Sequence, residues 1–432
     1  MMPNLFTSAQ RWQFLIVLGI HQFALCAHLA LATEFHSLGY IPWSGPGPYN
    51  GPTSVAYAVS DDGSVAAGNA TLPIGSQAVI WSLDTGLQRI GNVPDEWNSI
   101  AVDMSRDGKN VLVQQSCEIC NQYSYNGPRP PNGRALWTQD NGFTYFSYGS
   151  FAYALSPDGQ SVVGSNQFIN GGRTDPAYWT QADGWHSLGK LSEVNNPSRA
   201  SGLALAMSAD KNTVVGYADY SVAPLPQRAK PFRWTAQTGI QAINLPPGYT
   251  EGKAVGVSDD GSVIVGVLSD NAAGPIFRWT AAEGMQLIAA NGESPVISSD
   301  GNTIAWTGGG KSIAAPDEFR GYAFVWDTEH GSRILQDLLI QDDVDLSEWR
   351  LATVRDISTD GRTFAGYGIN TVNYNLASHY PVRGWIATLG VVPEPTSAML
   401  LASGLALSFA ILRKARQPAK KGQRPLTDVP GV

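Results

Sequence analysis

One arrangement of apolar and polar positions returns seven times along the 432-residue chain. Each copy has a short apolar segment, then Ser, any residue, Asp and usually Gly, then a second apolar segment that ends on small residues. The motif serines are Ser60, Ser105, Ser156, Ser208, Ser258, Ser298 and Ser358. The aspartates two positions later are Asp62, Asp107, Asp158, Asp210, Asp260, Asp300 and Asp360. Two apolar segments joined by a short polar turn predict a β-hairpin.

A second half follows each hairpin. It has an aromatic segment with Trp and, in six copies, a turn ending in Gly and a further short apolar segment. The tryptophans are Trp81, Trp137, Trp179, Trp234, Trp279, Trp326 and Trp385. The glycines are Gly86, Gly142, Gly184, Gly239, Gly284 and Gly331. Successive copies lie 40 to 60 residues apart, which fits a unit of four β-strands.

The seventh copy lacks its fourth segment, because only residues 386–390 follow Trp385 before a Pro-rich stretch. The missing segment has a counterpart at residues 35–39, Phe-His-Ser-Leu-Gly, which echo Trp-His-Ser-Leu-Gly at 185–189. An N-terminal strand that pairs into the last copy closes a ring and hides its edges. We therefore expect an all-β fold over residues 33–390, a seven-bladed β-propeller closed by the N-terminal strand.

In a propeller the first strand of each copy lies beside the central channel. The residue four positions before the motif Ser is small in most copies: Ala56, Ala101, Ala152, Ala204, Ala254, Ser294 and Val354. The residue directly before it is larger: Val59, Met104, Leu155, Met207, Val257, Ile297 and Ile357. Because side chains alternate along a strand, we expect these two sets on opposite faces, so that a small face packs on a neighbour's large one.

The turn itself explains the repeated polar residues. Ser and Asp oxygens accept backbone N–H groups within a hairpin, and Gly adopts the positive φ that the turn needs. Gly follows Asp in six copies, and Lys211 replaces it in the fourth. The array therefore predicts seven turns rather than seven metal or catalytic sites.

The N-terminal residues 1–32 have the organisation of a secretory signal peptide. Arg11 precedes a long apolar stretch, which ends in Ala30-Leu31-Ala32. We expect cleavage after Ala32. The alternative is an uncleaved membrane anchor, but His21 and Gln22 interrupt the apolar run.

The C-terminal region reads as a membrane stop signal. Residues 397–412 carry no charge and predict a short transmembrane helix, about 24 Å long. The basic cluster behind it is Arg413, Lys414 and Arg416, which is expected to stay cytoplasmic with a basic, disordered tail at 417–432. The repeat domain would then lie on the outer side of the membrane.

Residues 391–416 resemble the bacterial PEP-CTERM sorting signal. The match comprises Val392-Pro393-Glu394-Pro395, the short apolar helix, and the cluster of Arg413, Lys414 and Arg416. The resemblance implies export by the secretion machinery, transient anchoring in the inner membrane, and recognition by an exosortase that delivers the protein to the cell surface or beyond. The tail after Arg416 is longer than such signals usually have. The alternative is a Pro-rich linker before an ordinary anchor.

The repeats resemble the extracellular HAF repeat family. The matching segments are Leu38-Gly39, residues 56–63 (Ala-Tyr-Ala-Val-Ser-Asp-Asp-Gly) and Ala323-Phe324-Val325-Trp326. Residues 154–159, Ala-Leu-Ser-Pro-Asp-Gly, also look like the repeats of TolB-type propellers. Such resemblance indicates a fold and says little about an activity.

Charge limits the choice of partners. Seven of the 28 basic and two of the 36 acidic residues lie outside residues 33–392, which leaves that region with a formal charge of −13. A surface this acidic repels phosphate backbones, so nucleic acid is excluded as a partner. Composition favours cations or neutral glycans instead.

Two small groups of residues are candidates for covalent or metal chemistry. Cys117 and Cys120 are the only cysteines beyond the signal peptide, and they predict either a local disulfide or two free thiols. Two cysteines cannot form a four-ligand zinc site. The acidic group Asp342, Asp343, Asp345 and Glu348 is compatible with a solvated loop, a weak calcium site or a pair of glycosidase carboxylates. We expect no cofactor.

Two insertions carry exposed aromatic residues. Residues 117–134 add Tyr123 and Tyr125, and residues 367–380 add Tyr374, His379 and Tyr380. Aromatic side chains on loops above a rigid ring can stack on sugars or anchor a partner protein. We therefore predict a non-enzymatic structural or binding module, in the exopolysaccharide or biofilm setting that the PEP-CTERM resemblance implies. The alternative is a secreted propeller enzyme that acts on extracellular glycans.

Overall fold

The computed structural model describes residues 32–390 except 43–51, 73–74, 92, 94–97, 117–132, 148–149, 168–172, 193–199, 221–227, 270–272, 310–320 and 371–381. Residues Thr33–Leu389 form one compact unit. Residues 1–31 of the predicted signal peptide and the whole sorting signal and tail, 391–432, lie outside the described residues. So do Cys117, Cys120, Tyr123, Tyr125, Tyr374, His379 and Tyr380. No helix within the described residues has the length and hydrophobicity needed to span a bilayer.

The first four copies each form a four-stranded antiparallel sheet in which the strands follow chain order. The first sheet comprises β2 (Ser54–Val59), β3 (Val65–Leu72), β4 (Gly75–Ser82) and β5 (Gly86–Arg89). The second comprises β6 (Asn98–Met104), β7 (Asn110–Ser116), β8 (Gly133–Thr138) and β9 (Gly142–Tyr145). The third comprises β10 (Ser150–Leu155), β11 (Ser161–Asn166), β12 (Asp175–Thr180) and β13 (Gly184–Ser187). The fourth comprises β14 (Gly202–Met207), β15 (Val214–Tyr220), β16 (Arg228–Thr235) and β17 (Gly239–Ala242).

The fifth and sixth copies share one seven-stranded sheet. Its strands are β18 (Lys253–Val257), β19 (Val263–Val267), β20 (Ala273–Thr280), β21 (Gly284–Ile297), β22 (Ile304–Gly308), β23 (Tyr322–Asp327) and β24 (Gly331–Ile334). The first part of β21 pairs with β20 and its last part with β22. These two copies have the shortest spacing in the chain, 40 residues between Ser258 and Ser298, so the last strand of one runs directly into the first strand of the next.

The seventh copy completes its sheet with the start of the domain. The strand order is β1 (Glu34–Ser37), β27 (Val382–Thr388), β26 (Thr363–Asn370) and β25 (Trp349–Ile357). Phe35 pairs with Ala387 in antiparallel register, and its ring meets the Trp349 ring edge-on at 5.0 Å between centroids. The single described helix, α2 (Leu335–Gln341), precedes β25 and buries Leu335 and Leu339. The predicted pairing of the N-terminal segment with the last copy is thus present.

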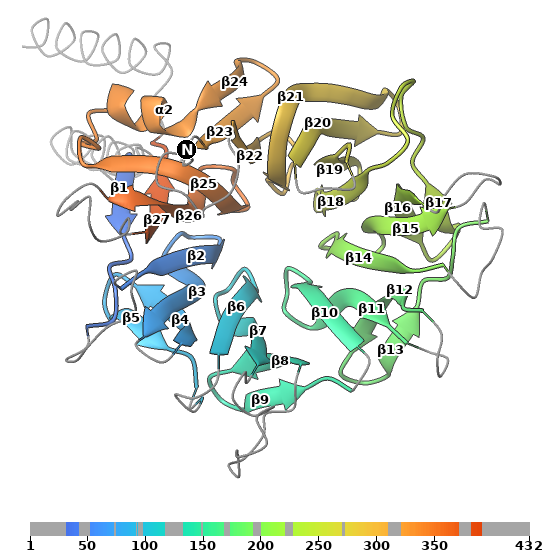
Figure 1. Ribbon diagram of the computed structural model, residues 1–432, viewed down its shortest axis with the longest axis horizontal. Helices are drawn as coiled ribbons and strands as arrows, with labels where there is room; N and C mark the ends of the chain where they lie inside the picture. Colours follow the sequence, from blue (N-terminus) through green and yellow to red (C-terminus); the bar gives the residue numbers. More distant parts are fainter. Residues whose placement is uncertain are drawn as a thin grey trace, which may run out of the picture. The chain divides into compact units, whose positions relative to one another are not determined.

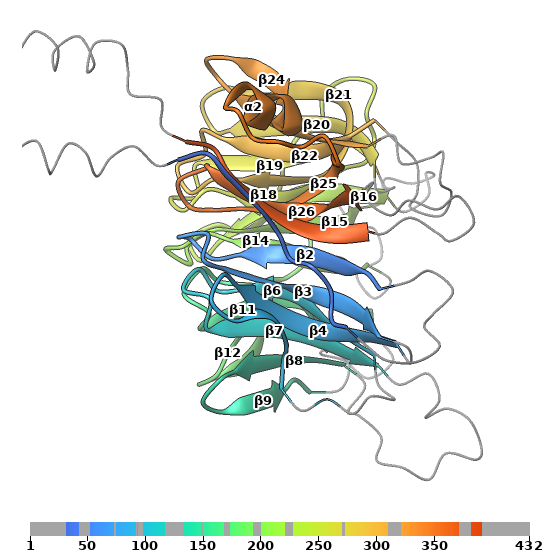
Figure 2. The same ribbon diagram turned by 90° about the vertical axis from the view of Figure 1, so that its left-hand side faces the viewer.

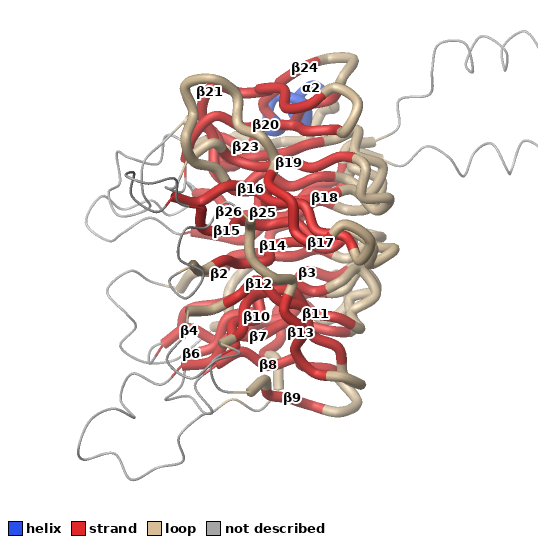
Figure 3. Tube along the Cα trace, turned by 90° about the vertical axis from the view of Figure 1, so that its right-hand side faces the viewer, coloured by secondary structure: helices blue, strands red, loops and turns tan. Residues whose placement is uncertain are grey.

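The sheets stand radially around a central axis, and the first strand of each copy is innermost (Figure 1). Side views show them side by side around that axis (Figures 2 and 3). Apolar side chains fill the spaces between neighbouring sheets. Ala67 and Ile90 of the first copy, for example, pack against Met104 and Val111 of the second. Second strands such as β19 are buried along their whole length, which explains their uninterrupted apolar sequence. Each large side chain buried this way contributes about 1.5–3 kcal/mol.

The Ser-x-Asp-Gly motifs are turns, as predicted. In all seven copies the Ser hydroxyl donates to the Asp carboxylate at 2.5–2.7 Å. The same hydroxyl accepts the backbone N–H five residues later, at 2.9–3.0 Å. The residue after Asp has positive φ in every copy, including Lys211 at 58°. At Gly261 a Cβ would also approach Thr213 Oγ1 of the preceding copy to 2.3 Å, so glycine is required there twice over.

The expected alternation along the first strands is wrong, because each of these strands contains a register shift. In the first copy Ala56 pairs with Gly68 and Val59 with Ala66, while Tyr57 has no partner in the ladder. The positions four and one before Ser therefore lie on the same face. The same shift occurs in the other six copies. A bulge adds one residue to a strand and turns the following side chains over.

Candidate functional site

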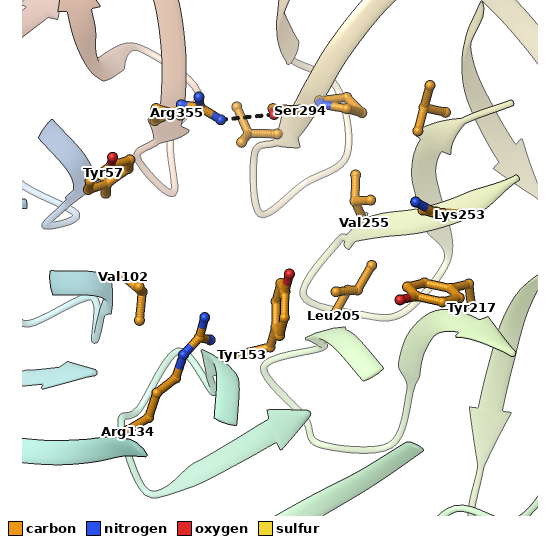
Figure 4. A pocket seen from close by; sticks show the side chains of 13 residues that line it. Tyr57, Val102, Arg134, Tyr153, Leu205, Tyr217, Lys253, Val255, Ser294 and Arg355 are labelled. Carbon is orange, nitrogen blue, oxygen red and sulfur yellow. Dashed lines mark hydrogen bonds between the residues drawn. The ribbon is translucent and has the colours of Figure 1, made fainter. Parts of the chain in front are cut away.

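The innermost strands surround a central cavity of about 510 Å³. The residue three positions before each motif Ser, next to or at the bulge, contributes to its lining in every copy. These residues are Tyr57, Val102, Tyr153, Leu205, Val255, Pro295 and Arg355. Seven sequence-distant segments thus place one side chain each around the same space (Figure 4). The cavity volume lies within the range of about 300–1,000 Å³ that small-molecule sites occupy.

The polar side chains of this cavity are cationic or carry a hydroxyl group. Among the described residues they are Arg134, Lys253, Arg355, Tyr57, Tyr153, Tyr217 and Ser294. Arg134 lies in β8, Lys253 begins β18 and Arg355 lies in β25, so three different copies supply the charges. The cavity is therefore cationic inside a domain whose overall charge is strongly negative.

Arg355 is held by neutral partners. Its Nη1 donates to Ser294 Oγ at 3.0 Å, and its Nη2 donates to the Tyr367 hydroxyl at 3.0 Å. The guanidinium also lies 5.5 Å from the Tyr367 ring centroid and 6.0 Å from that of Tyr57. These contacts orient the guanidinium without neutralising it, and aromatic faces attract such a cation.

Arg134 has a similar environment. It donates from Nε and Nη2 to Gln114 Oε1 at 3.3 and 3.1 Å and from Nη1 to the Ala152 carbonyl. Its guanidinium carbon lies 4.8 Å from the centroid of the Tyr153 ring. Burial lowers the pKa of Arg134, but an arginine keeps its charge in any ordinary protein site. On the other side of the cavity, Lys253 Nζ lies 5.2 Å from the Tyr217 ring centroid.

The tyrosines supply ring faces and hydrogen-bond donors. Burial raises the pKa of Tyr57 and of Tyr217, so both phenols stay protonated at neutral pH. Tyr153 remains 43% exposed. Protonated phenols beside fixed cations can donate hydrogen bonds to an oxygen-rich ligand and present a face for stacking.

Two carboxyl groups lie one residue closer to the turns than the cavity lining. Asp103 Oδ2 accepts the N–H of Leu155 in the next copy at 2.6 Å. Asp356 Oδ2 likewise accepts the N–H of Val59 at 2.8 Å. Burial raises the pKa of Asp103 to about 6 and that of Asp356 to about 7, although hydrogen bonds from backbone N–H groups favour the charged form. These groups tie neighbouring copies together and titrate near neutrality.

At the turn end of the sheets, backbone hydrogen bonds link neighbouring copies. They involve the residues that directly follow the motif serines. The N–H of Asp61 donates to the Arg106 carbonyl at 2.9 Å, and that of Arg106 to the Pro157 carbonyl at 3.0 Å. The Arg106 guanidinium makes two hydrogen bonds with the Asp259 carboxylate, from Nη1 at 2.6 Å and from Nη2. This ion pair joins the second copy to the fifth.

The chain enters and leaves the domain at that same turn end. Glu34, at the start of β1, and Thr363, just after the last motif, both pair with Thr388 at the end of β27. Leu389 N donates to the Arg362 carbonyl, also next to that motif, at 3.0 Å. The cavity extends toward the opposite end of the strands, because its lining includes Lys253, the first residue of β18. Both ends of the domain therefore lie at the turn end, whereas Lys253 lies at the opposite end of the strands.

A smaller hollow of about 170 Å³ adjoins the cavity between the third and fourth copies. Tyr153 and Tyr217 line both spaces. Phe151 lines only the smaller one and is 58% exposed, which is unusual for so large an apolar side chain. The two hollows therefore share two aromatic side chains.

The acidic candidates from the sequence lie elsewhere, at and after the C-terminus of α2. Asp342 Oδ2 accepts the Thr33 hydroxyl at 2.6 Å, and Asp343 has a φ of 64°. A hydrogen bond from the Ser347 N–H at 3.0 Å lowers the pKa of Asp345. Glu348 directly precedes β25. Within the described residues, no three His, Cys, Asp or Glu side chains gather closely enough to hold a metal ion.

Sequence reasoning missed the cavity residues, although a signal was available. Position minus three from the motif Ser holds Tyr, Val, Leu, Pro and Arg in different copies, while its neighbour at minus four is Ala in five of seven. A variable position beside a nearly constant one indicates a side chain that does not pack between neighbouring copies. Arg134 carried no such signal, because it lies on a third strand, β8, and neither did Lys253, which lies two residues before Val255 on β18.

No protein-family model matches the chain, and no curated protein matches it. Among solved structures, an oligogalacturonate lyase from Vibrio parahaemolyticus aligns with a TM-score of 0.50 at 9% identity, covering 85% of this chain and 98% of the lyase. The β-propeller domain of the Trilobed protease from Pyrococcus furiosus aligns with a TM-score of 0.47 at 10% identity, covering 77% and 95%. The β-propeller domain of Cps50 (Swd1) from Myceliophteria thermophila gives 0.45 at 13% identity, covering 82% and 99%.

The described domain is a β-propeller. Its radial four-stranded sheets and innermost first strands define this fold. At such identities the likeness extends to the fold alone. What the propeller binds or does has to be argued from the side chains of its cavity.

Proposed function

We propose that this protein is an exported, non-enzymatic β-propeller that binds an extracellular ligand in its central cavity. The observation that carries the proposal is the lining: three cations and three tyrosines from separate copies converge on one open space. Such groups recognise a ligand through charge, hydrogen bonds and stacking. The phenols remain protonated because burial raises the pKa of Tyr57 and Tyr217, so they act as donors rather than as bases.

We propose further that the propeller has seven blades and that β1 closes the ring. Three observations support this. The sequence has seven copies of the motif, the long strand β21 serves as the last strand of one copy and the first of the next, and β1 pairs with β27. In such a ring β1 covers the edge of β27, which would otherwise be free.

The export route rests on the two ends of the sequence. A signal peptide over 1–32 would direct the chain to the secretion machinery, and residues 391–416 would hold it transiently in the inner membrane for an exosortase. The protein would then reach the cell surface or the surrounding matrix, as a HAF-type repeat protein in an exopolysaccharide or biofilm setting. Because Thr33 and Leu389 lie at the turn end of the propeller, attachment through either end would leave the opposite end, where Lys253 lies, facing away from the point of attachment.

Mass spectrometry of the mature protein tests the route. We expect an N-terminus at Thr33 and a C-terminus near Pro393-Glu394-Pro395, without Arg413 and Lys414. A mature protein that retains the basic cluster would overturn exosortase processing and leave simple anchoring.

Binding is tested with the polysaccharide or surface proteins extracted from the producing organism. The mature protein should retain one of them, and its tryptophan fluorescence should change on binding. New reducing ends or unsaturated sugars during the incubation would identify the propeller as an enzyme acting on extracellular glycans and overturn the non-enzymatic part of the proposal.

A further inference from the structure

We infer that the central cavity binds an acidic oligosaccharide, a chain of sugars whose carboxylates meet Arg134, Lys253 and Arg355 while its rings stack on the cavity tyrosines and on Phe151. The inference rests on the proposed function of the cavity as a ligand site, and it names the class of ligand.

The charge of the cavity lining differs from that of the domain as a whole. Composition makes the region 33–392 acidic, with a formal charge of −13, yet the described cavity lining contains three cations and no carboxylate. Arg134 and Arg355 are oriented by Gln114, Ser294 and Tyr367, which are all neutral. Their charge is therefore available to an anion. The carboxyls of Asp103 and Asp356 lie one residue closer to the turns. Burial raises their pKa values to about 6 and about 7, so at neutral pH both keep part of their negative charge, and that of Asp103 acts on Arg134.

The three cations of the cavity come from three separate strands. Arg134, Lys253 and Arg355 come from β8, β18 and β25, and in Figure 4 they approach the cavity from three sides. A site for a single compact anion such as phosphate gathers its donors on one point. Cations spread around a cavity of about 510 Å³ fit a larger ligand that carries several separate charges.

Aromatic side chains line both the cavity and the adjoining hollow. Tyr153 and Tyr217 belong to both the cavity and the adjoining hollow, where Phe151 is 58% exposed. Sugar rings stack on aromatic faces, and two adjoining hollows have room for more than one ring. The arrangement therefore points to a chain rather than a single sugar.

The backbone of Ser294, beside the cavity, is strained. Ser294 has a φ of 50°, a region that residues other than glycine rarely adopt, and its hydroxyl accepts a hydrogen bond from Arg355. Backbone strain of this kind persists where the surrounding structure requires it and clusters at binding sites. Here it fixes the direction of a cation that faces the cavity.

The test is calorimetric titration of the mature protein with five probes: the trimers of galacturonic acid and of mannuronic acid, galacturonic acid itself, the neutral trimer of mannose, and inorganic phosphate. We expect at least one acidic trimer to bind tenfold or more tightly than either the neutral trimer or phosphate. Its affinity should fall as salt is raised.

Variants assign the contacts. Arg355→Gln and, separately, Lys253→Gln should each weaken the acidic trimer tenfold or more, whereas Lys109→Gln, on an exposed turn, should leave it unchanged. Phe151→Ala should weaken the trimer and spare the single acidic sugar, because only a chain reaches the second hollow. Melting temperatures show whether each variant is folded; Lys253→Gln tests the cavity even if Arg355→Gln is not.

Equal binding of the acidic and neutral trimers, or of phosphate and an acidic trimer, would overturn the acidic-oligosaccharide assignment. So would an unchanged affinity in both charge variants. If none of the probes binds but the organism's own polysaccharide does, the assignment of an acidic oligosaccharide is refuted and the proposed ligand-binding function is retained. If neither the probes nor that polysaccharide binds, both proposals are refuted.

Discussion

Arg106 of the second copy and Asp259 of the fifth form an ion pair with two hydrogen bonds, which links copies that are not neighbours in the chain. The side chains are 30% and 31% exposed, so water screens the pair only in part. Asp61 lies 3.7 Å from Arg106 Nε and adds a weaker contact. The pair lies at the turn end of the propeller, where it joins the second copy to the fifth.

A double-mutant cycle should measure this link. Arg106→Gln and Asp259→Asn should each destabilise the propeller, and the two together should cost less than the sum of the single changes. We expect a coupling energy of about 1–3 kcal/mol from urea unfolding. Lys109→Gln is the control, because its side chain is 80% exposed and its ion pair contributes little. A coupling energy near zero would show that the pair does not stabilise the ring.

Stability should fall as pH rises from 5 to 8. The folded-state pKa values of Asp103 and Asp356, about 6 and about 7, exceed the usual 3.8, so the folded state binds more protons than the unfolded state in this window. Unfolding free energy therefore decreases as both groups lose their protons. Each unit of pKa shift corresponds to about 1.4 kcal/mol. Because both side chains keep some solvent exposure, we expect a smaller total loss of about 2 kcal/mol.

Urea unfolding at pH 5 and pH 8 checks the sign. The turn carboxylates, such as Asp62 with its lowered pKa, are ionised throughout this window and contribute no slope. Asp356→Asn cannot ionise, so its stability should change less between the two pH values. An identical slope in the variant would assign the pH dependence to other groups.

Lys211→Gly should stabilise the fourth turn. Lys211 has a φ of 58° where the other six copies have glycine, and a left-handed backbone costs an ordinary residue about 1 kcal/mol. The lysine also forms an ion pair with Asp158 at 2.7 Å, which the glycine loses. The gain should therefore be larger at high salt, where that pair is screened. Thermal unfolding at low and high salt measures it, and a loss of stability at high salt would contradict the expectation.

Removing β1 should destabilise the whole propeller. A mature chain that begins at Leu38 loses the antiparallel pairing with β27 and the contact between Phe35 and Trp349. We expect a loss of about 3 kcal/mol or more and a tendency to associate through the exposed edge of β27. Urea unfolding and light scattering measure both effects. A chain that begins at Glu34 is the control, and equal stability of the two chains would refute ring closure by β1.

The local structure of this protein is encoded locally. The motif Ser, Asp and Gly form a turn through contacts within five residues, so each hairpin could be predicted from the sequence. The likeness of residues 35–39 to 185–189 likewise predicted the pairing of β1 with β27, although 348 to 354 residues separate the paired positions along the chain.

The bulges escaped prediction for a physical reason. A strand read by alternation places Ala56 and Val59 on opposite faces, and nothing in the apolar pattern marks the extra residue Tyr57. Only the register against the neighbouring strand reveals it. The bulge is nevertheless what turns Tyr57 and its six counterparts toward the axis.

Composition also did not predict the charge of the cavity. The acidic average suggested cations or neutral glycans, whereas Arg134, Lys253 and Arg355 converge on the axis. The sequence by itself therefore determined the repeats, the turns, the four-stranded units and the pairing of the first strand with the last copy, because short-range contacts and internal likeness specify them. Only the tertiary structure decided which side chains share the cavity, because that depends on strand register and on a ring that brings residues 57 to 355 around one axis.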